Sequence, residues 1–121
     1  MKASILKPDF ASEFFTPERC YIVESSKSDC DSSVSIAHAR VRPGVTTMLH
    51  SLDSTDERYI ILKGRGRVEV GPSLVADVEA NDVVLIPSGV SQRITNTGTA
   101  DLLFYCICTP PFKPSCYRTL E

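Results

Sequence analysis

Turn-forming residues interrupt this chain so regularly that they constrain its fold more than any other feature. Short apolar segments end repeatedly at Gly, Pro, Asn or Asp, with a turn roughly every 8–12 residues. Apolar residues nowhere recur at the helical spacing of about 3.6 residues over three turns, and only residues 9–15 predict a short helix. Short strands between turns are typical of a sandwich or barrel, so we predict an all-β fold.

About nine segments have the composition of strands, rich in β-branched and aromatic residues and followed by a turn signal. They are residues 21–24, 34–41, 46–51, 58–63, 67–70, 74–78, 83–86, 91–96 and 102–108. The connections between them leave no room for crossover helices, which excludes a βαβ architecture. The proline-rich residues 109–121 predict an extended tail that packs on the barrel.

The length and charge of the chain restrict its class and its partners. At 121 residues it fits one domain, residues 1–121, which begins with an N-terminal segment over residues 1–20. The 13 Lys and Arg residues are spread evenly and the net charge is −2, so no basic face for nucleic acid can form. No apolar run approaches the roughly 20 residues of a membrane span, and the N-terminus lacks a signal-peptide core. We therefore expect a cytoplasmic protein that binds neither nucleic acid nor membrane.

Two stretches of the chain combine turn residues with polar residues at fixed offsets. The first, GVTTMLHSLDSTDERYIILKG, spans residues 44–64, and the second, NDVVLIPSGVSQRITN, spans residues 81–96. Gly44, Gly64 and Gly89 predict chain reversals with positive φ, and the proline of the second stretch predicts the end of a strand. This pair of stretches resembles the two motifs of the cupin superfamily. The resemblance implies a jelly-roll barrel, also called a double-stranded β-helix, with a small-molecule cavity.

The resemblance also implies a metal site, from which this chain departs. The usual cupin site takes two histidines one residue apart, a glutamate, and a third histidine from the second motif. The first histidine matches His50 and the glutamate matches Glu57. Leu52 stands at the second histidine position and Gln92 at the third. We therefore predict His50, Glu57 and Gln92 as ligands of a weakened site for a divalent metal, with iron, manganese, nickel and zinc all compatible.

Each residue of this site also has a simpler interpretation. A histidine on a strand is commonly a satisfied polar residue, and Glu57 precedes an arginine that can pair with it at the barrel rim. Alternation along its strand does not fix the direction of Gln92. His38 differs, because Ala37 and Ala39 form the apolar face of its own strand. We predict that His38 faces solvent.

The five cysteines are interpreted as free thiols. An odd number without a secretory signal argues against a disulfide framework, and no CxxC pair occurs. Most are expected to be buried as small hydrophobic residues. In the cupin barrel, residues 102–108 resemble the strand beside the histidine-bearing one, so either Cys106 or Tyr105 projects near His50, depending on register. A thiol there, from Cys106 or Cys108, is an alternative metal ligand or redox partner.

Two classes of function fit these residues. The first is a small-molecule enzyme of the dioxygenase, isomerase or lyase type, in which a metal held by His50, Glu57 and Gln92 polarises the substrate. Without a metal, Glu57 can act as a general base, which makes it the candidate catalytic residue. The second is a non-catalytic module that binds a small ligand, an alternative that Leu52 favours because it removes one imidazole.

Self-association is the remaining expectation. Open strand edges are an aggregation liability that a partner can cover, and small cupins commonly pair. We expect a homodimer with two-fold symmetry. The tail segment 110–114, with Phe112 and Tyr117, is the candidate material either for the interface or for packing across the chain's own barrel.

Overall fold

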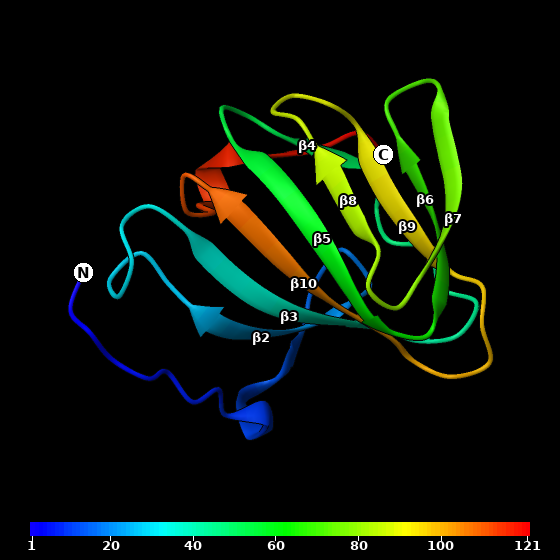
Figure 1. The fold of residues 1–121 in the computed structure, drawn as a ribbon. Coiled ribbons are helices and arrows are strands. Elements are labelled where there is room, and N and C mark those ends of the chain that lie inside the picture. The colour runs from blue at the N-terminus through cyan, green and yellow to red at the C-terminus, as the bar shows by residue number, and fades with distance from the viewer.

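Eleven strands supply nearly all of the regular structure, and they form two antiparallel sheets that face each other (Figure 1). The structure is a computed structural model and describes residues 1–121. Its only helical segments are two 3₁₀ turns of 3 residues each. No helix is long and apolar enough to cross a membrane. The predicted all-β fold is confirmed.

The larger sheet has six strands in the order β1-β2-β3-β10-β5-β8. Its strands are β1 (Phe14–Phe15), β2 (Tyr21–Ser26), β3 (Ser35–Val41), β10 (Leu102–Thr109), β5 (Asp56–Lys63) and β8 (Val83–Ile86). β10 lies between β3 and β5, so the last long strand of the chain pairs with two strands from its first half. The sheet is therefore held together by contacts between residues that are distant in sequence.

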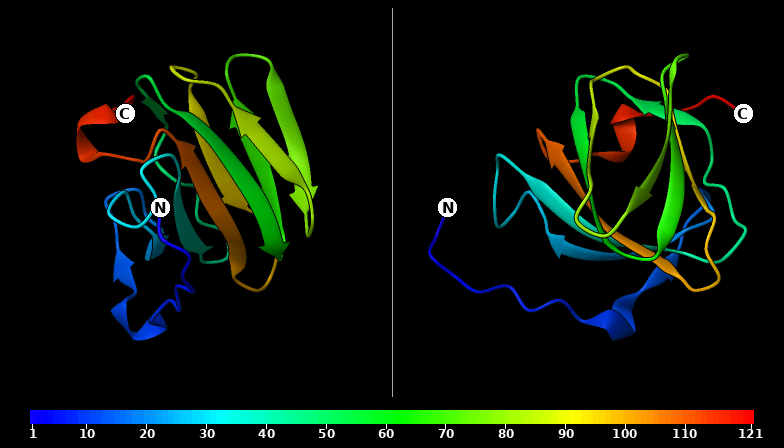
Figure 2. Two further views of the ribbon diagram at one scale, coloured as in Figure 1. Left: turned by 60° about the vertical axis from the view of Figure 1, so that its left-hand side comes forward. Right: turned by 45° about the vertical axis from the view of Figure 1, so that its right-hand side comes forward.

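The smaller sheet has five strands in the order β11-β4-β9-β6-β7. Its strands are β11 (Tyr117–Thr119), β4 (His50–Leu52), β9 (Gln92–Asn96), β6 (Arg65–Val70) and β7 (Leu74–Glu79). Figure 2 shows the two sheets curving toward each other into a barrel. Inward-facing apolar side chains of both sheets fill the core, and the largest that are fully buried are Phe104, Ile61, Ile94 and Leu102. The predicted jelly-roll barrel is confirmed.

The predicted turns lie where the glycines and the proline indicated. Gly44, Gly64 and Gly89 have φ values of 78°, 93° and 78°, which L side chains rarely adopt. At Gly64 a side chain is also excluded by space, because a Cβ atom would lie 2.9 Å from the carbonyl oxygen of Asp101. Pro87 directly follows the last residue of β8. These positions fix how the strands around the two motifs reverse.

The N-terminal segment corrects the prediction of a helix over residues 9–15. Only Phe10–Ser12 form a 3₁₀ turn, and β1 follows at once. The Asp9 carboxylate accepts the Ala11 N–H at 2.9 Å and so caps this single turn. Pairing of β1 with β2 then extends the chain, which is why the helical pattern ends after one turn.

His38 lies on the outer face of the larger sheet, as alternation predicted, but the prediction that it faces solvent is wrong. Only 8% of its surface is exposed. The Phe10 ring covers it edge-to-face with ring centroids 5.1 Å apart, and Tyr105 of the neighbouring strand lies at 5.8 Å. Burial lowers the pKa of the His38 imidazole. Alternation gives the face on which a residue lies but not what the N-terminal segment places over it.

The C-terminal tail packs on the chain's own barrel. The Phe112 N–H donates to Ser35 Oγ at 2.8 Å, and β11 then joins the edge of the smaller sheet. In β11, Thr119 pairs with His50. The prediction of an extended tail is therefore incomplete, because the tail also contributes a strand to the smaller sheet. The predicted strand over residues 46–51 is shorter than expected, since only its end belongs to β4.

The outer face of the larger sheet supports a prediction about self-association. On the edge strand β8, Val83 and Leu85 are 58% and 66% exposed, and Leu62 of the neighbouring strand β5 is exposed as well. Exposed apolar edges favour a covering partner. We expect a homodimer in light scattering at micromolar concentration, and Leu85→Lys should shift it toward the monomer mass. Val75→Lys on β7 is the control, and a monomeric unmodified protein would contradict the prediction.

Candidate functional site

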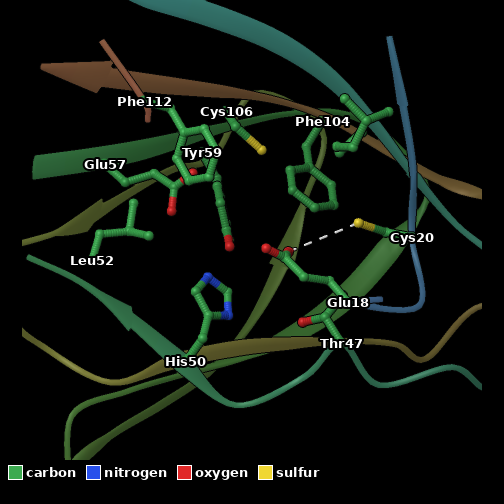
Figure 3. Close-up of a pocket in the computed structure, with 12 residues that line it drawn as sticks. Glu18, Cys20, Thr47, His50, Leu52, Glu57, Tyr59, Phe104, Cys106 and Phe112 are labelled. Carbon is green, nitrogen blue, oxygen red and sulfur yellow. Dashed lines mark hydrogen bonds between the residues drawn. The ribbon is translucent and has the colours of Figure 1, made fainter. Parts of the chain in front are cut away.

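The three predicted site residues come from both sheets and meet between them. His50 of β4 and Gln92 of β9 are direct cross-strand partners in the smaller sheet. Glu57 of β5 points toward His50 from the larger sheet (Figure 3). His50, Gln92 and Glu57 are buried, with 3%, 1% and 7% of their surface exposed. The strand register thus brings together residues from three separate segments of the sequence.

A cavity in two adjacent parts, which share five lining residues, lies beside these residues. The deep part has a volume of about 30 Å³ and is lined by His50 and Glu57 among mainly apolar neighbours. The outer part, of about 450 Å³, lies between β2, β3, β10 and the C-terminal tail. The residues that line both parts are Glu18, Ile22, Glu57, Cys106 and Phe112. The outer part has the size of a small-molecule site, for which roughly 300–1,000 Å³ is usual.

The His50 ring is held in one orientation and one tautomer. Its Nδ1 atom lies 2.8 Å from the Met48 carbonyl oxygen, which can only accept, so Nδ1 carries the proton. The Tyr117 ring stacks on it, with centroids 4.9 Å apart and planes 19° from parallel. The other nitrogen, Nε2, faces the space between Glu57 and Tyr59 (Figure 3). In the deep part of the cavity, the lone pair of His50 Nε2 can therefore accept a hydrogen bond or coordinate a metal ion.

Glu57 is a buried carboxyl group with one unused oxygen. Oε2 lies 3.6 Å from Cys108 Sγ, whose thiol donates to it, whereas Oε1 has no hydrogen-bond partner. Burial raises the pKa of Glu57 to about 7, against the opposing influence of the neighbouring Gln92 amide and His50. The simpler interpretation of Glu57 as the rim partner of Arg58 is wrong, because that guanidinium donates to Thr109 Oγ1 and to a main-chain carbonyl oxygen instead.

Gln92 is fixed by a tyrosine that sequence reasoning did not single out. The Tyr59 hydroxyl donates to Gln92 Oε1 at 2.6 Å, and both groups are buried. The amide nitrogen Nε2 of Gln92 has no hydrogen-bond partner. An orphaned buried donor costs free energy unless something accepts from it, at roughly 1–3 kcal/mol. Gln92 thus contributes an unsatisfied donor to the site, while its oxygen is already used.

Glu18 is a polar residue of the cavity that the sequence did not reveal. It lies between β1 and β2 in the N-terminal segment, and its carboxylate points into the deep part of the cavity (Figure 3). The Cys20 thiol donates to it, with Sγ 4.0 Å from Glu18 Oε2. Burial raises the pKa of Glu18, and His50 opposes this rise. No motif marks Glu18, and only the path of the N-terminal segment places it here.

The thiols of the cavity are inert rather than ionised. Cys106 projects into the cavity and Tyr105 lies on the outer face, which settles the register that the sequence left open. Burial raises the pKa of Cys106 well above its ordinary value and raises that of Cys20 to about 12. For Cys108, burial and the neighbouring Glu57 raise the pKa as well. A protonated thiol is a poor metal ligand and a poor nucleophile.

The residues as they stand do not form a complete metal site. His50 Nε2 and Glu57 Oε1 are free donor atoms, but Gln92 Oε1 accepts from Tyr59. No group of three His, Cys, Asp or Glu side chains lies close enough to hold a metal ion. The site has two available ligands where a stable site needs three or four. Metal binding by His50, Glu57 and Gln92 stays a prediction.

The missing imidazole can be supplied by mutation. Leu52 lines the deep part of the cavity beside His50. It stands where the cupin motif usually has its second histidine. Leu52→His should tighten Ni²⁺ binding by about tenfold or more, because imidazole is a strong ligand for this ion. Isothermal titration calorimetry measures the change, and Leu52→Asn, polar but without an imidazole, is the control. Equal affinity in both variants would show that position 52 cannot complete the site.

Burial of Glu57 predicts a pH-dependent stability. Its pKa rises from 4.5 to about 7 on folding, so the folded protein keeps this proton where the unfolded chain has lost it. The stability that the neutral carboxyl contributes is complete below pH 4.5 and falls by up to about 3 kcal/mol as the pH rises to 7. Glu57→Gln cannot ionise, so its free energy of unfolding should not show this fall. Urea denaturation at pH 4.5 and pH 8 compares the two, and parallel pH profiles would contradict the assignment.

Solved structures resemble this barrel closely enough to show its fold. A protein from Thermotoga maritima described as a predicted oxalate decarboxylase aligns with a TM-score of 0.73 at 22% identity, over 87% of this chain and 93% of that one. KdgF from Halomonas sp. aligns with a TM-score of 0.78 at 12% identity, over 90% and 96% of the two chains. Bacillus subtilis oxalate decarboxylase, which has Mn(II) centres, aligns with a TM-score of 0.79 at 21% identity, over 91% of this chain and 30% of that one.

Sequence comparison identifies the family. An uncharacterised protein of Methanocaldococcus jannaschii is 32% identical over 87 residues, which cover 72% of this chain and 69% of that protein. Residues 37–108, more than half of the chain, match the cupin domain family and include all three residues of the predicted site. This protein belongs to the cupin family.

Proposed function

We propose that this chain is a small-molecule enzyme of the isomerase or lyase type, in which Glu57 transfers a proton to or from a substrate bound in the cavity. One observation carries the proposal. Glu57 Oε1 is buried without a partner and borders both parts of a cavity large enough for a small molecule. A buried carboxyl oxygen left unsatisfied by the protein is available to a ligand.

The surroundings of Glu57 suit proton transfer. A general acid or base is most effective when its pKa lies near the working pH, and burial brings the pKa of Glu57 to about 7. Protonated and ionised forms are then both populated near neutrality. The cavity thiols, by contrast, stay protonated, so they do not compete as bases.

His50 supplies a hydrogen bond for a bound substrate. Its Nε2 atom can accept, because Nδ1 carries the ring proton, and His50 lines the deep part of the cavity. A substrate that exchanges a proton with Glu57 can therefore be held by this acceptor from the opposite sheet. Positioning of this kind contributes much of the rate of proton-transfer enzymes. The Gln92 amide lines neither part of the cavity and acts on Glu57 instead, whose pKa it lowers.

The similar structures are consistent with a lyase, but they do not identify the substrate of this chain. Several of the similar structures are oxalate decarboxylases, which are lyases that act on a small carboxylate. Their identity to this chain is below 25%, so their substrate is not carried over. What supports the isomerase or lyase type here is the carboxyl group of Glu57 itself. The dioxygenase type needs a bound metal, for which the site is incomplete.

Solvent exchange tests the proposal without knowledge of the substrate. A panel of small carbonyl compounds is incubated with the protein in D₂O, with and without EDTA, and proton loss next to the carbonyl is followed by NMR. We expect exchange of at least one compound, and Glu57→Gln should slow it by about 100-fold or more. Glu79→Gln, an exposed residue on β7, is the matched control.

Three outcomes separate the alternatives. Exchange that EDTA abolishes would show a metal-dependent enzyme. Exchange that is unchanged in Glu57→Gln would contradict the role of this carboxyl group. Binding of a compound without any exchange would favour the non-catalytic module that holds a small ligand.

A further inference from the structure

The deep part of the cavity presents hydrogen-bond acceptors on several sides. His50 Nε2, Glu57 Oε1 and the Glu18 carboxylate all face the same small space (Figure 3). Glu57 is 93% buried and Oε1 has no partner within the protein, so the space is built around an unmet acceptor. A ligand group that enters it must bring hydrogen-bond donors.

The deep part of the cavity has more acidic than basic groups. None of its lining residues is Lys or Arg, whereas two of them are glutamates, and the His50 imidazole is the one basic group. The outer part has one lysine, Lys27, and its ammonium lies 3.3 Å from a carboxylate oxygen of Glu24. A carboxylate ligand would therefore meet two glutamates against a single imidazole. Electrostatic complementarity favours a cation instead.

The lack of a three-residue metal-binding cluster favours an ammonium group over a metal ion as the ligand. Metal ligands lie roughly 2.0–2.2 Å from the ion, so they must crowd together. No three acidic, imidazole or thiol side chains are that close here. Hydrogen bonds to an ammonium nitrogen are longer, about 2.7–2.9 Å, and its three N–H donors reach three acceptors that stand further apart.

The shape of the cavity limits the rest of the ligand. The deep part, of about 30 Å³, admits only a slender terminal group, since about 10–15 Å³ corresponds to one water-sized sphere. The outer part has a volume of about 450 Å³, and its walls include the apolar side chains of Phe14, Ile22, Ile36 and Phe112. Such walls suit a ligand whose aliphatic or aromatic part lies in the outer part while its polar end points into the deep part.

We infer that the cavity takes a primary amine with a slender apolar body, whose ammonium group is held by Glu18, Glu57 and His50. This inference rests on the proposed function, because it takes the same cavity as the working site, and it adds a primary amine to the groups that a substrate of this site carries. Glu18 is the residue that selects the charge. It adds a second carboxylate to the deep part of the cavity, in a family site where this chain lacks an imidazole.

Three compounds with one carbon skeleton test the inference. Hexylamine, hexanol and hexanoate are titrated into the protein by isothermal titration calorimetry in the presence of EDTA, which removes any contribution from metal. We expect hexylamine to bind more tightly than hexanol and hexanoate to bind weakest. Glu18→Gln should weaken hexylamine binding by about tenfold and leave hexanol binding nearly unchanged, because only the amine carries a positive charge that the Glu18 carboxylate attracts.

Controls make each result decisive. Glu79→Gln removes the same charge from an exposed site and should leave all three affinities unchanged. Unchanged hexanol binding in Glu18→Gln shows that the variant is folded and its cavity intact. Tighter binding of hexanoate than of hexylamine, or equal hexylamine binding by Glu18→Gln and the unmodified protein, would overturn the inference. Binding of hexanol alone would overturn the ligand class while leaving the proton-transfer role of Glu57 to the exchange experiment.

Discussion

The inward-facing row of β5 is the constraint on which both the core and the site depend. Glu57, Tyr59 and Ile61 are buried, while the residues between them point outward. The register of this row is fixed on one side by β10, where Tyr59 pairs with Cys106, and on the other by β8. A slip by one residue would turn the whole row to the outside, so the packing that holds Ile61 in the core also holds Glu57 at the cavity.

Residues of the same row form hydrogen bonds that satisfy several buried polar atoms of the interior. Tyr59 is buried, and its hydroxyl satisfies the oxygen of Gln92 from the opposite sheet. Cys108 satisfies one oxygen of Glu57. Of the buried polar atoms that stay unsatisfied, Glu57 Oε1 and Gln92 Nε2 belong to the site, whereas His38 Nδ1 lies on the outer face of the larger sheet. Proteins keep such atoms where a ligand can use them, since elsewhere they only reduce stability.

Much of this arrangement could be predicted from the sequence because it depends on local signals. Turn residues and alternation located most strands, and Gly64, whose positive φ and lack of space exclude a side chain, marked the turn between β5 and β6. The two motifs located His50, Glu57 and Gln92. Alternation also placed His38 on the correct face, but covering by Phe10 is a tertiary contact that no local pattern reports.

The residues that the sequence missed are placed by long-range packing. Glu18 enters the cavity because β1 and β2 pair at the edge of the larger sheet, and the turn between them reaches over the barrel. Tyr117 stacks on His50 because β11 joins β4, although the proline-rich tail has little strand character. Neither contact has a signature in spacing or composition. Tertiary packing thus adds the Glu18 carboxylate and the Tyr117 ring to a site that the two motifs describe only in part.

The two halves of the site belong to different sheets, with Glu57 on the larger and His50 on the smaller. Between them, the barrel core consists of apolar contacts, which have no preferred direction. A ligand that bonds to Glu57 and His50 together is therefore a non-covalent cross-link between the sheets. Its binding free energy adds to the free energy of unfolding, by about 2.7 kcal/mol at a concentration of roughly 100 times its Kd. In this barrel, occupancy of the cavity and the free energy of unfolding are therefore linked.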